Sequence, residues 1–278
     1  MGGTGDLRRT WEAAAPGWAQ WEETFSAGLG EATKALLDMA GIGPGTRVLD
    51  LACGAGSQTL QAARRVGPAG QVVATDIAAT MLAHLRENAR RAGLGNITTL
   101  ESPAEELDAQ LPPFDAAISR FGLMLFASPA RALAAVRGVL KPQARVAALV
   151  FTTPAANPFM ATPMQVLLRH AGKPPPAPGQ PGIFALGGNG VLEKLMADSG
   201  FADLHSRVVR APLRLASAAD ALAMIQQAFG AYRAVIADLD ESRKQAAWDE
   251  VAEVLKEFEI EDGLATELEF VIAAGSHG

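Results

Sequence analysis

The sequence of 278 residues contains a single cysteine, Cys53, and only four histidines. One cysteine excludes an internal disulfide and a zinc site made of several thiolates, and it is typical of proteins of the reducing cytoplasm, where we expect this chain to reside. The histidines, at positions 84, 170, 205 and 277, show no metal-ligand spacing. We therefore predict no metal site.

Long apolar runs and an excess of positive charge are also missing. No run approaches the ~18 apolar residues of a membrane-spanning helix, and the N-terminus lacks the apolar segment of a secretory signal, so we expect no membrane association. The net charge of −6 disfavours a broad nucleic-acid surface. A hydrophobic content of 49% predicts instead a globular chain with a substantial core.

The most informative stretch is 47–60, R-V-L-D-L-A-C-G-A-G-S-Q-T-L. Its apolar start predicts a buried strand, Gly54 and Gly56 a tight turn, and the residues from Ser57 onward a helix. Glycine at such a turn lets a ligand approach the backbone where a Cβ would clash, and the helix start offers free N–H groups. Strand, glycine turn and helix in succession are typical of the ligand-facing edge of a parallel nucleotide-binding sheet.

Alternating strands and helices continue to Phe151, which predicts a doubly wound, Rossmann-like α/β fold. We expect a mostly parallel, seven-stranded sheet with helices on both faces, N-terminal helices, and a C-terminal helical insertion forming a lid. Prolines in 152–160 and 173–182 argue against regular structure there. Three domains or segments are predicted: 1–43 as a helical lid, 44–152 as a cofactor-binding core, and 153–278 as the remaining sheet with a substrate-binding helical insertion.

Two carboxylates narrow the choice of nucleotide. Asp76 closes the second predicted strand, where it can accept hydrogen bonds from both hydroxyls of a ribose; the alternative is a helix N-cap. Thr59 stands where a dinucleotide fingerprint has its third glycine, and no P-loop is present. Asp50 would repel a pyrophosphate but can hold an ammonium group. A ligand with a ribose and a cationic amino-acid tail fits, and S-adenosylmethionine (SAM) is such a ligand.

Four motifs in order resemble those of the class I SAM-dependent methyltransferases. They are V-L-D-L-A-C-G-A-G-S-Q-T, V-V-A-T-D-I-A-A-T-M-L, F-D-A-A-I-S-R-F-G-L-M-L-F and V-L-K-P-Q-A-R-V. The resemblance covers about 44–152 and is nearest to the small-molecule enzymes of the ubiquinone/menaquinone-biosynthesis type. One departure is Pro103, preceded by Ser102, where such enzymes often have an aspartate that binds the adenine amino group.

The resemblance implies SAM as cofactor, S-adenosylhomocysteine (SAH) as product, and a set of contacts. Asp50 and the glycine turn would hold the methionine moiety, and Asp76 would bind the ribose. Ile77 and the Ala104 N–H would contact the adenine. Arg120 and Phe121 would lie at the cofactor's edge. The expected cofactor-binding residues are Asp50, Ala52, Cys53, Gly54, Gly56, Gln58, Asp76, Ile77, Met81, Ala104, Glu105, Arg120 and Phe121.

Aromatic residues outside this span are candidates for a lid or an acceptor pocket. Trp11, Trp18 and Trp21 would lie along one helical face, either as anchors to the main body, as a lid, or as a homodimer contact. Phe159 and Phe184, with Met160, Met164, Met224 and Phe229, are candidates for an apolar pocket, core packing being the alternative for each. Cys53 fits packing better than a nucleophile, since no partner base is evident.

The predicted function is methyl transfer from SAM to an O, N or C atom of a small, apolar or aromatic metabolite. No catalytic group is identified; His170 is the weak candidate for a general base. Alignment and exclusion of water meet most of the demands of methyl transfer. Two alternatives remain open: a SAM-binding protein that does not transfer methyl groups, and a nicotinamide-dependent oxidoreductase, which the missing third glycine and Asp50 disfavour.

Overall fold

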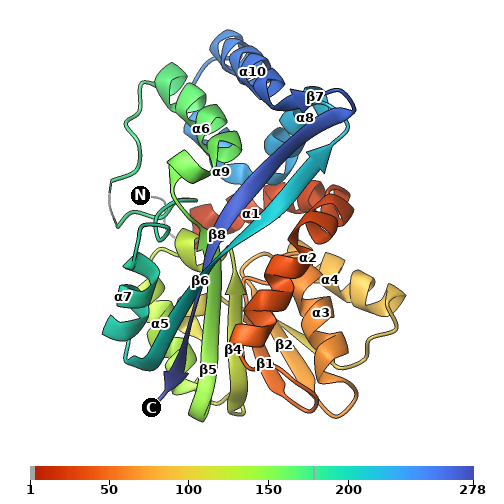
Figure 1. Ribbon diagram of the computed structural model, residues 1–278, viewed down its shortest axis with the longest axis vertical. Helices are drawn as coiled ribbons and strands as arrows, with labels where there is room; N and C mark the ends of the chain where they lie inside the picture. Colours follow the sequence, from red (N-terminus) through yellow and green to blue (C-terminus); the bar gives the residue numbers. More distant parts are fainter. Residues whose placement is uncertain (1–3, 178) are drawn as a thin grey trace.

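A twisted sheet passes through the molecule and carries helices on both faces (Figure 1). The structure, a computed structural model, describes residues 4–177 and 179–278. Over this part of the chain the strands are β1 (Arg47–Leu51), β2 (Gln71–Asp76), β3 (Ile97–Glu101), β4 (Phe114–Arg120), β5 (Leu140–Phe151), β6 (Phe201–Leu215), β7 (Glu259–Ile260) and β8 (Gly263–His277).

The strand order is β3-β2-β1-β4-β5-β8-β6, with β7 paired to β8. Neighbours from β3 to β5 are parallel, whereas β8 runs antiparallel to both β5 and β6. Counted over the described residues and without the two-residue β7, the sheet has seven strands, so the predicted mostly parallel, seven-stranded Rossmann-like sheet is confirmed.

The helices fall into two groups, one on the sheet and one beyond the carboxyl ends of its parallel strands. In Figure 1, α2 and α3 lie against one face, α5 and α7 contact each other on the other, and α6, α8, α9 and α10 gather above. Their bounds are α1 (Thr4–Gln20), α2 (Glu22–Met39), α3 (Ser57–Val66), α4 (Ala79–Arg91), α5 (Pro129–Gly138), α6 (Pro158–Ala171), α7 (Val191–Asp198), α8 (Ala218–Ala228), α9 (Gly230–Val235) and α10 (Glu241–Leu255). Single 3₁₀ turns are η1 (Ala104–Glu106), η2 (Leu123–Leu125), η3 (Pro154–Ala156) and η4 (Lys256–Phe258).

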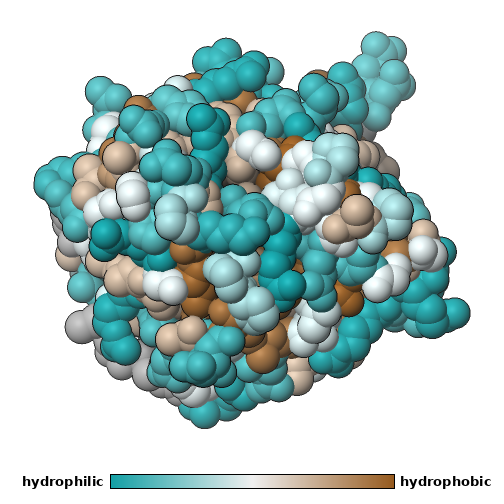
Figure 2. All heavy atoms as spheres, turned by 90° about the horizontal axis from the view of Figure 1, so that it is seen from below, coloured by the Kyte–Doolittle hydropathy of each residue, from teal (hydrophilic) through white to brown (hydrophobic). Residues whose placement is uncertain are grey.

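The core lies between the sheet and its helices. Leu49, Ile118 and Phe270, from three of the strands, are 0% exposed. A strand that is covered on both faces has a continuous run of apolar residues. For this reason β1 and β5 could be predicted from the sequence. Seen from below, where the parallel strands begin, the surface is mainly hydrophilic, with small apolar areas between polar side chains (Figure 2). None of the described helices has the length and apolar character needed to cross a membrane.

The absence of regular structure predicted for 152–160 is wrong at its end, because α6 begins at Pro158. Proline is tolerated there, since the first N–H of a helix has no partner within the helix. Pro163 lies inside α6, but Phe159 and Leu167, buried on the same helix, pack into the core. Apolar burial thus offsets the lost backbone hydrogen bond.

Candidate functional site

A large cavity lies at the carboxyl ends of the parallel strands. Its volume is about 1580 Å³, counting the space at its open mouth. The loops after β1, β2, β3 and β4 form its floor. The other walls are supplied by α1, α2, α6, α8, α9, β5, β6 and β8. In open α/β sheets ligands bind at this edge, so this cavity is the candidate site for a nucleotide and for a second molecule beside it.

The glycine turn between β1 and α3 forms one wall of this cavity. Gly54 has a φ of 55°, and a Cβ there would meet no protein atom within 4 Å, so that it would project into open space. Gly56 has a φ of 97°, and a Cβ would lie 2.1 Å from Leu85 Cδ1 on α4. Glycine is therefore required at Gly56 for packing, and at Gly54 it leaves a cradle in which a ligand can contact the backbone.

Asp50 lies beneath this turn rather than on the cavity surface. It is 0% exposed; its carboxylate accepts a hydrogen bond from Thr59 Oγ1 at 2.5 Å and one from Gln58 Nε2 at 3.3 Å. Burial raises the pKa of Asp50 to about 7, against the lowering effect of these bonds. Gln58 lines the cavity and Asp50 does not. In this structure Asp50 therefore contacts Gln58 and Thr59 behind the cavity wall, and its predicted hold on an ammonium group, directly or through water, stays a prediction.

Asp76 reaches the cavity from the end of β2 and is 8% exposed. Its Oδ2 accepts from the Gly54 N–H and its Oδ1 from the Ala78 N–H, both at 2.9 Å. Burial raises the pKa of Asp76, and the hydrogen bonds from backbone N–H groups act in the opposite direction. The N-cap of α4 is Ala78, so the bond from the Ala78 N–H does not make Asp76 the helix N-cap that the sequence left open. The carboxylate instead braces the turn before α4 and the glycine turn. Each oxygen keeps lone-pair capacity for a hydroxyl donor.

The structure brings the other expected cofactor-binding residues to the same cavity. Besides those already placed, the lining includes Ala52, Cys53, Ile77, Met81, Ala104, Glu105, Arg120 and Phe121. Burial raises the pKa of the Cys53 thiol well above its ordinary range, which keeps it protonated and unsuited to nucleophilic attack. Ser102, next to the unusual Pro103, donates to the carbonyl oxygens of Pro103 and Glu106.

The lid and pocket candidates divide into two groups. Trp11 and Trp18 line the cavity, but Trp21 instead donates from Nε1 to Gln227 Oε1 on α8 at 2.8 Å. Phe159 and Phe184 are not among the lining residues. Phe159 packs edge-on against Phe258, and Phe184 packs against Phe151, whose own side chain does line the cavity.

His170, the candidate base, lies at the end of α6 and outside the cavity. Its Nε2 is 2.7 Å from Glu250 Oε2 on α10. The imidazole therefore ties two peripheral helices together.

Several lining residues had no counterpart among the sequence candidates. They are mostly apolar and come from α2, β6, β8 and α9: Phe25, Leu29, Pro212, Leu213, Tyr232, Leu268 and Phe270. The i, i+4 spacing of Phe25 and Leu29 is a signal that marks one face of α2. The residues of β6 and β8 carry no comparable signal, because their position depends on the antiparallel pairing of distant segments.

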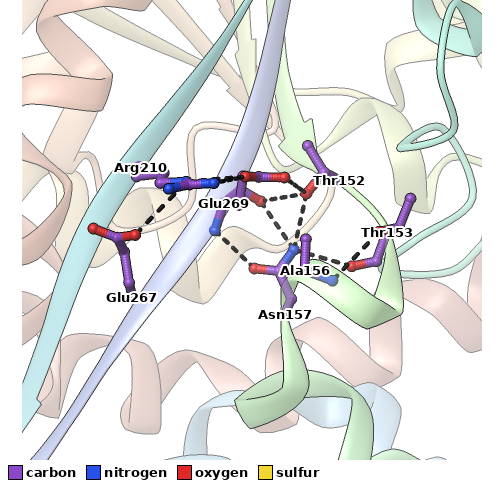
Figure 3. Close-up of polar contacts among 7 residues, drawn as sticks. All are labelled: Thr152, Thr153, Ala156, Asn157, Arg210, Glu267 and Glu269. Atoms are coloured by element: carbon purple, nitrogen blue, oxygen red, sulfur yellow. Dashed lines mark hydrogen bonds and ion pairs between the residues drawn. The ribbon is translucent and has the colours of Figure 1, made fainter.

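A buried polar network fixes the wall formed by α6. Asn157, which is 0% exposed, donates to Thr152 Oγ1 and to the Thr153 and Glu269 carbonyl oxygens, and its Oδ1 accepts from the Glu269 N–H at 2.8 Å (Figure 3). Glu269 in turn contacts Arg210 on β6. The network joins the end of β5, the start of α6 and the two long antiparallel strands, and so holds Met160 of α6 against the cavity.

Comparison with known proteins places this fold and motif set among methyltransferases. The family described as "Methyltransferase domain" matches residues 48–143. The ubiquinone/menaquinone biosynthesis C-methyltransferase of Pasteurella multocida is 38% identical over 124 residues, 44% of this chain and 46% of that protein. The 2-phytyl-1,4-naphtoquinone methyltransferase of Trichormus variabilis is 33% identical over 158 residues, 56% of this chain and 69% of that protein.

Among solved structures, the fold is similar to that of the Haemonchus contortus phosphoethanolamine N-methyltransferase 2 in complex with phosphomonomethylethanolamine and SAH. The TM-score is 0.59 at 20% identity, covering 97% of this chain and 58% of that one. The chain spans about half the length of most of the curated relatives that it matches.

Proposed function

Because the chain belongs to the class I SAM-dependent methyltransferases, we propose that it transfers a methyl group from SAM to a small, apolar or aromatic metabolite. The observation that carries the proposal is the cavity, in which the glycine turn and Asp76 share one space with an apolar chamber. The names of the relatives favour a carbon atom of a quinone-type ring as the methyl acceptor.

The described residues fit the cofactor. The open cradle at Gly54 suits close approach of the methionine moiety to the backbone, and Asp76 suits the ribose hydroxyls. Ile77 and Met81 offer an apolar surface to the adenine, beside the η1 turn that carries Ala104. When bound, SAM supplies a methyl group on a positively charged sulfur, which becomes neutral when the methyl leaves.

The chain's own part in the reaction is alignment and exclusion of water. Phe25, Met224 and Phe229 on the helices, with Leu268 and Phe270 on β8, surround the space beyond the glycine turn. An apolar enclosure favours a transition state in which the sulfonium charge is dispersed, and it holds the acceptor within about 3–3.5 Å of the methyl group. We assign the acceptor walls to 1–43 and 153–278, and the cofactor floor to 44–152.

Calorimetric titration with SAH and with NAD tests the cofactor. We expect SAH to bind and Asp76→Ala to weaken it about 10- to 100-fold, the loss of one strong hydrogen-bonding group. Asp108→Ala, an exposed aspartate that is not part of the cavity lining, is the matched control and should leave affinity unchanged. Binding of NAD without SAH would contradict the proposal.

Incubation with methyl-labelled SAM and reduced 1,4-naphthoquinone then tests the acceptor class. We expect label in the ring product. Tight SAH binding without transfer to this or any acceptor in a panel of phenols and amines would favour a SAM-binding protein with another role.

A further inference from the structure

Two oppositely charged side chains line the cavity without forming an ion pair. Glu22 is the first residue of α2, and Arg120 is the last residue of β4. Arg120 is 6% exposed, and burial lowers its pKa to about 10, so it stays charged at neutral pH. Among residues 4–177 and 179–278, neither side chain makes an ion pair. A buried charge without a partner is costly.

Arg120 is held in place but keeps free donors. Its Nη1 donates to Thr33 Oγ1 at 2.8 Å, and the Thr33 hydroxyl donates to the Leu29 carbonyl oxygen. Its Nε is buried and has no hydrogen-bond partner within the described part of the chain. A guanidinium that is oriented on one side and unsatisfied on another is suited to a carboxylate, which it can bind through two parallel hydrogen bonds.

Glu22 is linked to the glycine turn by a chain of hydroxyl groups. Ser26 Oγ donates to Glu22 Oε1 at 3.1 Å and lies 3.1 Å from Ser57 Oγ, at the first residue of α3. The Glu22 carboxylate is thereby tied to the segment that we assign to the methionine moiety. Burial raises its pKa, and Arg120 is the neighbouring charge that lowers it.

Resting on the proposed function, we propose that Glu22 and Arg120 bind the amino-acid end of the cofactor, Glu22 its ammonium group and Arg120 its carboxylate. An α-amino acid carries an ammonium group and a carboxylate on the same carbon atom, so it neutralises both side chains at once. The rest of the cavity is lined mainly by apolar groups, so an apolar acceptor has no use for either charge. Glu22 lies outside residues 48–143, the span that matches the family.

The consequence is selectivity for the complete cofactor. A nucleoside that lacks the amino-acid end would leave the buried charge of Arg120 and the partly buried charge of Glu22 without a partner. Glu22 also makes α2 part of the cofactor site, so that cofactor binding holds this helix against the glycine turn.

Calorimetry with SAH, decarboxylated SAH and 5′-methylthioadenosine tests this assignment. The variants are Arg120→Met and Glu22→Gln, with Arg131→Met and Glu23→Gln, both at exposed positions, as matched controls. We expect each site variant to weaken SAH about 10- to 100-fold, with no change for 5′-methylthioadenosine. In Arg120→Met, SAH and decarboxylated SAH should bind equally.

Arg120→Lys keeps the positive charge and should retain part of the preference for SAH over decarboxylated SAH. This variant keeps the assignment testable if Arg120→Met does not fold. The wild type gives an independent check, since it should prefer SAH to decarboxylated SAH. The inference is overturned if the wild type binds SAH no better than 5′-methylthioadenosine, or if the variants weaken both ligands alike. Failure of the wild type to bind any of the three would instead overturn the proposed function.

Discussion

Replacing Asp50 by asparagine should remove a pH dependence of stability that comes from one buried carboxyl group. Asp50 is fully buried, and burial raises its pKa from 3.8 to about 7. The folded state therefore holds this proton over a pH range in which the unfolded chain has released it. Stability from this group is greatest below pH 4 and is lost as pH rises toward 7.

The magnitude follows from the two pKa values. Between them the free energy of unfolding falls by about 1.4 kcal/mol for each pH unit, so that it should drop by about 2–3 kcal/mol from pH 5 to pH 8. Groups whose pKa is lowered by folding, such as Asp115 and Glu250, lose their contribution only in more acidic solution, outside this range.

Urea unfolding at pH 5, 6, 7 and 8 measures the effect. The difference in the free energy of unfolding between the wild type and Asp50→Asn should change by about 2–3 kcal/mol between pH 5 and pH 8. Asp262→Asn, at an exposed position in the turn before β8, is the control and should follow the wild type. Parallel pH profiles for the wild type and Asp50→Asn would refute the reasoning.

Two further predictions concern the walls of the cavity. Asn157→Ala removes the buried side chain that bridges β5, α6 and β8, and it leaves the Glu269 N–H without a hydrogen-bond acceptor. Chemical denaturation should therefore show a loss of about 2–4 kcal/mol in the free energy of unfolding. A loss below about 1 kcal/mol would mean that the network is dispensable. Tyr232→Phe deletes the hydroxyl that donates to the Met160 carbonyl oxygen at 2.8 Å and should cost about 1–2 kcal/mol in the same assay, whereas unchanged stability would show that this bond contributes little.

The parallel part of the sheet and its glycine turn could be predicted because their signals are local. Apolar strands, a glycine turn and an aspartate at a strand end lie within thirty residues of one another, and each has a short-range physical reason. Even there, the sequence did not distinguish a side chain on the cavity surface from one just beneath it. Asp50 is such a case, since only the packing of Thr59 and Gln58 shows that its carboxylate is enclosed.

The walls that we propose for the acceptor could not be predicted, because they are assembled from segments far apart in the chain. The candidates Phe159 and Phe184 were chosen for being apolar, a property that core and cavity residues share. The residues that do line this side include Leu213 on β6 and Leu268 on β8, which meet through antiparallel pairing. The position of Glu22 in the cavity could not be predicted either, because glutamate is common in the first turn of any helix.

The position of β8 also imposes an order on assembly. β6 pairs only with β8 among the described strands, and β8 lies between β6 and β5. During synthesis on the ribosome, β6 emerges about sixty residues before β8, the strand that connects it to the sheet. The five parallel strands can pair as they appear, whereas the cavity has no wall on the β8 side until residues 263–277 have been made. The strands that carry the floor of the cavity can thus assemble before the cavity is enclosed.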